Sequence, residues 1–180
     1  LYEGPTDLAV VKGLVPTTST IVHRRRRGSN TGFPSRYFRF GEDQYYCLSY
    51  LAAEGKIAYS SGVEVLCGRG VNIFAGNVPG SESARLCLVD EIAYRRDALA
   101  TLGLSAPAEQ HVKAKLAAAQ LDILQQGLWF AKAGRTDWLM RSLRAQPELF
   151  LHLPRAIRSL LRIRQAADEN PKPQTRQAGE

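Results

Sequence analysis

A helix is predicted to begin at Glu42, and its position decides how the first half of the chain is organised. Gly41 precedes the acidic pair Glu42 and Asp43, and acidic side chains are favoured in a first turn because the helix dipole stabilises negative charge there. We therefore expect both carboxylates to be ionised near neutral pH. Gly55 stands where a helix end favours positive φ, and the residues between have the spacing of one buried face: Cys47, Leu48, Leu51 and Ala52.

Short extended segments are predicted on both sides of this helix. Residues 17–22 form a run rich in β-branched side chains before it, and residues 56–59 and 63–67 follow it with the composition of strands. The first run continues into basic residues 23–27 and then into a loop that ends in Gly-Phe-Pro at residues 32–34. In this part of the chain the predicted order is strand, basic run, loop, acidic helix start and strand.

This order resembles the C-terminal half of the catalytic domain of family 2 glycosyltransferases, which have the Rossmann-like GT-A fold. In that family a strand rich in Ser and Thr ends in Arg before a Gly-Phe loop, and a Glu-Asp pair opens the next helix. The resemblance covers roughly residues 15–78. It implies an α/β fold, with a partial GT-A domain at residues 1–80, followed by an α-helical region at residues 81–168 and a disordered tail at residues 169–180.

The resemblance implies an enzyme that transfers a sugar from a nucleotide-diphosphate donor to an acceptor hydroxyl, with inversion at the anomeric carbon. Asp43 matches the second acidic position of the family's motif and would be the base, and Glu42 would orient it or the acceptor. The acceptor would be a glycan, a lipid-linked sugar or a small molecule. Four further residues would contact the donor phosphates or the acceptor: Arg24, Tyr37, Arg69 and Asn72.

Several features of the family are missing from this chain. There is no Asp-x-Asp, and Cys67 and Gly68 stand where many members carry a metal-binding His, so the Mg²⁺ or Mn²⁺ that the resemblance implies has no identified ligands. The Gln-x-x-Arg-Trp motif of polymerising members is also missing, which favours non-processive transfer. The chain begins without Met and lacks the nucleotide-binding half, so we expect it to be a fragment or a processed product that is inactive alone.

Composition limits the compartment and the partners. The chain has 180 residues with a net charge of +7, and it has no apolar run near the roughly 20 residues of a membrane span and no signal peptide. The three cysteines lack the spacing of a zinc site and are expected to be free thiols in a reducing compartment. These features predict a cytoplasmic protein, with a peripheral contact at the inner face of the membrane. Nucleic acid is not predicted as a partner, because aromatic residues do not alternate with the basic ones.

Helical patterns dominate from Gly80 onward. Each predicted helix has a signal at its start or its end. The first starts at Ser81 or Ser83 and ends at Gly103, and the second starts at Ser105 and ends at Gly134. The third starts at Thr136, and the last two start at Pro147 and Pro154. A short helix is also predicted at residues 7–12, ending at Gly13.

The last of these helices is basic and amphipathic. Ile157, Leu160 and Leu161 lie on one side, and another side carries arginines at positions 155, 158 and 162. This helix supports an alternative to the enzyme, namely a non-catalytic basic helical module that binds a polyanion, a membrane surface or a partner protein.

Overall fold

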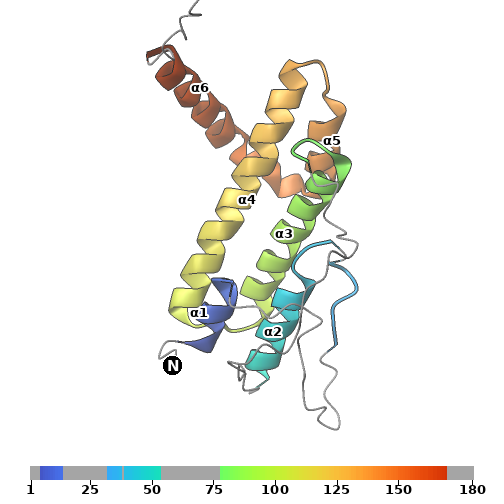
Figure 1. Ribbon diagram of the computed structural model, residues 1–180, viewed down its shortest axis with the longest axis vertical. Helices are drawn as coiled ribbons and strands as arrows, with labels where there is room; N and C mark the ends of the chain where they lie inside the picture. The colour runs from blue at the N-terminus through green and yellow to red at the C-terminus, as the bar shows by residue number, and fades with distance from the viewer. Residues whose placement is uncertain (1–4, 14–31, 38, 54–77, 170–180) are drawn as a thin grey trace, which may run out of the picture. The chain divides into compact units, whose positions relative to one another are not determined.

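The computed structural model describes residues 5–13, 32–37, 39–53 and 78–169, with side chains described as far as residue 162. Every regular element in these ranges is a helix (Figure 1). The elements are α1 (Thr6–Val11), α2 (Glu42–Ala52), α3 (Glu82–Thr101), α4 (Ala106–Lys132), α5 (Asp137–Ala145), the 3₁₀ helix η2 (Pro147–His152) and α6 (Leu153–Glu169).

The prediction of an α/β fold is wrong. The described ranges contain helices and no strand, whereas a GT-A domain is built around a sheet covered by helices. The resemblance to family 2 glycosyltransferases is overturned with it. The segments predicted as strands, residues 17–22, 56–59 and 63–67, lie outside the described residues. A β-branched run is weak support for a sheet, because strand propensity depends on the neighbours a strand packs against.

Local signals explain where the helices begin and end. Gly41 precedes α2 with φ 91°. This left-handed conformation is unfavourable for any residue that has a side chain. Ser81 precedes α3, and its hydroxyl oxygen accepts a hydrogen bond from the Ala84 backbone N–H at 3.1 Å. Pro147 opens η2, where its missing N–H is not needed. Of the two caps predicted for α3, Ser81 and Ser83, the structure shows Ser81, and the helix start predicted at Pro147 is confirmed.

The chain divides into two compact units, Leu1–Ile123 and Leu124–Glu180, called here the N-terminal and C-terminal units. In the N-terminal unit α2 packs against both α1 and α3. The centre of this packing is a cluster of buried residues from all three helices: Val10, Tyr46, Cys47, Leu48 and Ala98. Burial of these apolar side chains is the main favourable contribution to the stability of this unit.

The C-terminal unit consists of the end of α4 with α5, η2 and α6, and η2 contacts both α5 and α6. Trp138 of α5 is buried, and its ring centroid lies 5.9 Å from that of Phe130 in α4. Gly127 of α4 permits the close approach of α5, because a Cβ at that position would lie 2.8 Å from Leu139 Cδ1. Leu149 of η2 and Ala156 of α6 are also buried.

Candidate functional site

The predicted catalytic pair lies in the first turn of α2, as expected, and a third acidic residue that acts on it lies on α3. Asp90 of α3 interacts electrostatically with Glu42 and accepts a hydrogen bond from the Arg39 backbone N–H at 2.9 Å. The Asp43 carboxylate accepts a hydrogen bond from the Gln44 backbone N–H at 2.7 Å. The structure therefore places three carboxyl groups from two helices near one another.

The pKa of Glu42 is shifted in the direction opposite to the one that the helix dipole favours. Burial raises the pKa of the Glu42 carboxyl, and the nearby Asp43 and Asp90 carboxylates raise it further, although a backbone hydrogen bond opposes them. The helix dipole alone favours the opposite shift. Desolvation and like charges are the stronger effects here, so Glu42 takes up a proton more readily than an ordinary glutamate.

Tyr37, predicted to contact substrate, is buried in the core. Its hydroxyl donates a hydrogen bond to Asp97 on α3, and the Arg36 guanidinium pairs with the same carboxylate at 3.1 Å. Burial, followed by the hydrogen bond to Asp97, raises the pKa of Tyr37 far above its ordinary value. These contacts hold residues 32–37 against α3, which is a structural role. The other predicted contact residues, Arg24, Arg69 and Asn72, lie outside the described residues.

A polar chain of contacts joins the three helices beside the acidic group. The Tyr94 hydroxyl of α3 donates to Gln44 Oε1 of α2, and Gln44 Nε2 donates to the Val10 carbonyl oxygen of α1 at 2.9 Å. Within the described ranges, no group of three His, Cys, Asp or Glu side chains is arranged to hold a metal ion. The predicted Mg²⁺ or Mn²⁺ therefore gains no ligand set from this part of the chain.

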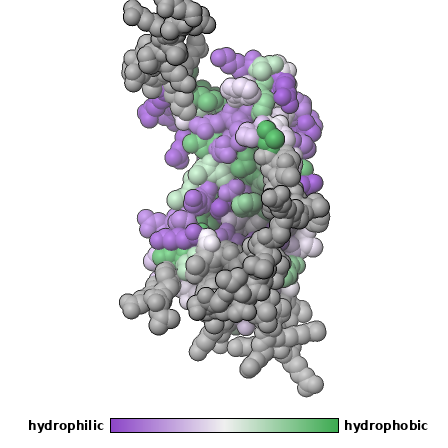
Figure 2. All heavy atoms as spheres, viewed as in Figure 1, coloured by the Kyte–Doolittle hydropathy of each residue, from purple (hydrophilic) through white to green (hydrophobic). Residues whose placement is uncertain are grey.

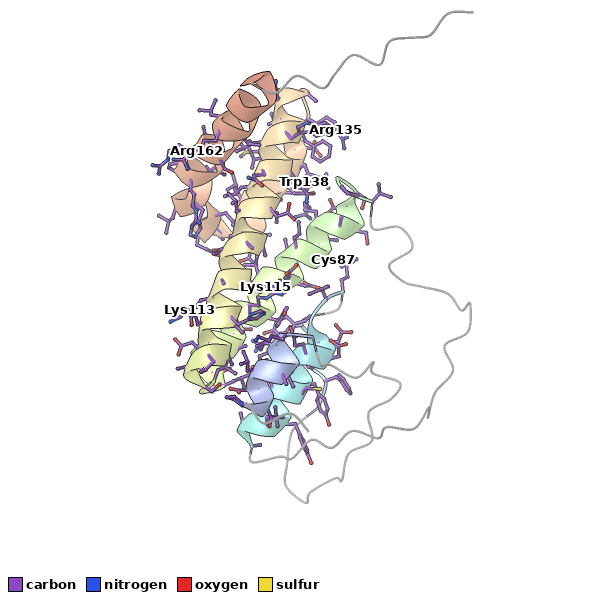
Figure 3. All side chains as sticks on the ribbon, turned by 60° about the vertical axis from the view of Figure 1, so that its left-hand side comes forward. Cys87, Lys113, Lys115, Arg135, Trp138 and Arg162 are labelled. Carbon is purple, nitrogen blue, oxygen red and sulfur yellow. The ribbon has the colours of Figure 1, made fainter. Side chains whose placement is uncertain are left out.

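The C-terminal unit carries a second candidate site on η2 and α6. We define the docking face as the exposed apolar and basic side chains of these two helices, which are Phe150, Leu151, Arg155, Ile157, Arg158, Leu161 and Arg162. Leu151 is the most exposed of them, with 80% of its surface accessible. Figure 3 shows Arg162 projecting outward from α6.

The docking face is arranged as two adjacent stripes along α6. Ile157 and Leu161 are four residues apart, so they lie one above the other, and the three arginines have the same kind of spacing on the neighbouring side. Ala156, on the opposite side, is fully buried against the unit. Among the described residues, none of these arginines is in an ion pair; Arg158 Nε donates only to the Pro154 carbonyl oxygen of its own helix, at 3.3 Å.

Sequence reasoning identified the stripes of α6 but missed the apolar residues of η2. Leu149, Phe150 and Leu151 are consecutive in a short 3₁₀ helix, so they point in three directions and only Leu149 is buried. The signal that could have found them is this apolar run between Pro147 and Pro154, which is too short to bury every side chain. Figure 2 shows hydrophobic and hydrophilic atoms interspersed on the visible face of the described residues.

No helix in the part of the chain that the structure describes is both long enough and apolar enough to cross a membrane. Comparison of the chain with protein-family models, curated proteins and solved structures gave no match.

Proposed function

We propose that the chain is a non-catalytic binding module whose C-terminal unit docks on an anionic membrane surface. The observation that carries this proposal is the docking face, where exposed apolar side chains lie beside three arginines that have no ion-pair partner in the described residues. Exposed apolar groups favour the boundary between headgroups and acyl chains, and arginines favour anionic headgroups. One surface with both properties supports a membrane rather than a purely aqueous polyanion.

The charge of the docking face suggests where it acts. Anionic lipids are concentrated in the cytoplasmic leaflet, and each basic side chain near such a surface contributes about 1 kcal/mol to binding. Contact through η2 and α6 would be peripheral, with the helix axis in the plane of the membrane. The proposal therefore places the protein at the inner face of the membrane.

Glycosyl transfer remains an untested prediction and is not the function that this geometry supports best. It depended on an α/β fold that the described helices overturn, and Tyr37 is occupied in the core. The nucleotide-sugar donor, the acceptor and the metal of that prediction likewise have no support from the described residues.

The proposal is tested by co-sedimentation with vesicles of phosphatidylcholine alone or mixed with phosphatidylglycerol. Binding should require the anionic lipid and weaken as salt rises, because salt screens the attraction. A triple change of Arg155, Arg158 and Arg162 to Gln should lower affinity about 100-fold, since three contributions of about 1 kcal/mol sum to about 3 kcal/mol.

Two controls distinguish the effect of charge on binding from a loss of folding and from the insertion of apolar side chains. The same three arginines changed to Lys keep the charge and should bind nearly as well as the unchanged protein. Changing Ile157 and Leu161 to Ser should weaken binding, whereas changing Met140, an exposed apolar residue of α5, to Ser should not. Binding that ignored lipid charge, or that survived the Gln substitutions, would contradict the proposal.

A further inference from the structure

Two consecutive apolar residues of η2 precede the basic helix of the docking face. We define the apolar tip as Phe150 and Leu151, which are 55% and 80% exposed. Leu151 is more exposed than any other large apolar residue in the described ranges. Water is an unfavourable environment for such side chains, so covering the tip with an apolar phase lowers the free energy.

The packing of η2 fixes the apolar tip in its exposed position. Leu149, the residue before the tip, is fully buried, and η2 contacts both α5 and α6. The Leu149 backbone N–H donates to the Gln146 carbonyl oxygen at 3.1 Å, and Gln146 is itself buried. Successive side chains of a 3₁₀ helix are rotated by about 120°, so burial of Leu149 directs the next two side chains away from the core. The tip is therefore preorganised and needs no folding step before it meets a partner.

The charges around the apolar tip restrict what can cover it. Arg155 follows Leu151 by four residues, and Arg158 and Arg162 lie on later turns of α6. A partner therefore needs an apolar phase next to anionic groups, and a lipid surface has both. The acidic residue of η2, Glu148, precedes the tip and is half-buried. Its charge is repelled by anionic headgroups, so the contribution of η2 itself has to come from its apolar side chains.

We propose that the apolar tip inserts between lipid headgroups as a wedge, and that the protein consequently prefers anionic membranes with loosely packed headgroups, such as strongly curved ones. This inference rests on the proposed function. Insertion of bulky side chains separates neighbouring headgroups, and this separation costs less free energy where gaps already exist. The attraction of the arginines depends instead on the surface charge. The two contributions can therefore be measured apart.

The first test compares small, strongly curved vesicles with large vesicles of the same mixture of phosphatidylcholine and phosphatidylglycerol, using flotation to measure binding. The unchanged protein should bind the small vesicles several-fold more tightly at equal accessible lipid. The double change Phe150→Ser and Leu151→Ser should lower affinity for the small vesicles about 100-fold and remove the preference, because burial of each side chain contributes about tenfold or more. Both positions are exposed, so the melting temperature should stay the same.

Two variants serve as controls for this comparison. The triple change of Arg155, Arg158 and Arg162 to Gln should weaken binding to both vesicles by the same factor and leave the preference intact, because it alters charge alone. Met140→Ser, which removes an exposed apolar side chain of α5, should change neither the affinity nor the preference.

The second test measures insertion directly through tryptophan fluorescence. Trp138 is buried and Trp129 is exposed, so Trp129→Phe gives a background in which a new tryptophan reports on its own surroundings. In that background Phe150→Trp should be quenched by vesicles whose acyl chains carry bromine. Met140→Trp, the matched control, should not be quenched.

The outcomes distinguish this inference from the docking proposal. Absence of binding to either vesicle would contradict the docking of the C-terminal unit itself. Binding without a preference for curved vesicles, a preference that survives the double Ser change, or a Trp at position 150 that bromine does not quench would each overturn the wedge and leave the docking proposal standing.

Discussion

Contacts of single residues explain why α2 begins where it does and lies against α3. Gly41 has φ 91°, and a Cβ at this position would lie 2.2 Å from Tyr94 Cδ1. Tyr94 is itself buried, and its hydroxyl donates to Gln44 one turn into α2. The absence of a side chain at Gly41 therefore serves both the left-handed backbone and the approach of the Tyr94 ring.

Gly41→Ala should destabilise the N-terminal unit by clearly more than the strain of a left-handed residue. That strain is about 1–2 kcal/mol, and the clash with a buried ring adds to it. Gly13→Ala is the matched control, since Gly13 has a similar φ of 106° but nothing within 4 Å of the added Cβ. The measurement is the free energy of unfolding in urea for both variants; equal losses would show that Tyr94 moves aside at no cost.

His111 should make stability depend on pH in the acidic range. Its pKa in the folded protein is lowered from 6.5, so between pH 6.5 and the lowered value the unfolded chain binds more protons than the folded one. The free energy of unfolding should therefore fall as the pH drops below about 6.5 and stop falling below the folded-state pKa. His111→Gln, which does not titrate, should remove this part of the dependence in thermal melts taken from pH 7.5 to 5. A variant whose melting temperature keeps the full slope would count against this assignment.

Single elements show what could be predicted from the sequence and what could not. The start of α3 was predicted from Ser81 or Ser83 and its end from Gly103, and these signals act within one turn of the helix. The acidic start of α2 was predicted correctly for the same reason. The α/β fold failed because a strand is defined by partners far away in sequence, and a β-branched run does not reveal them.

The candidate sites, like the helices, could be predicted only where the signal lies within one element. The stripes of α6 come from one helix and could be predicted from their spacing. The buried role of Tyr37 was missed because its partner, Asp97, lies 60 residues further along the chain.

The cap of α3 provides a prediction for one element. Ser81→Ala removes the hydroxyl that accepts from the Ala84 N–H and should cost about 0.5–2 kcal/mol of stability. Ser83→Ala lies inside the first turn of the same helix and should be neutral or slightly stabilising, because alanine has the higher helix propensity. Chemical unfolding of both variants gives the comparison. If Ser83→Ala proved as harmful as Ser81→Ala, the cap would not be the cause.

At the scale of the whole molecule, α4 belongs to both units. Ile123 is the last residue of the N-terminal unit and Leu124 the first of the C-terminal unit, and both are fully buried within one continuous helix. Helical backbone hydrogen bonds join residues four apart, so those around residue 123 span both units, and unravelling α4 in one unit breaks them. We therefore expect the two units to unfold together.

The chain carries its own reporters for this prediction, because all 7 tyrosines precede residue 124 and both tryptophans follow it. Ile92→Ala, at a fully buried position of α3, should destabilise the N-terminal unit by about 2–5 kcal/mol. With coupling through α4, the unfolding midpoint seen in tryptophan fluorescence should shift as far as the midpoint seen in the tyrosine signal, although no tryptophan lies in the altered unit. The reciprocal change, Leu149→Ala in η2, should move the tyrosine midpoint in the same way. Units that unfold independently would instead shift only the signal of the altered unit, and each variant would then separate one transition into two.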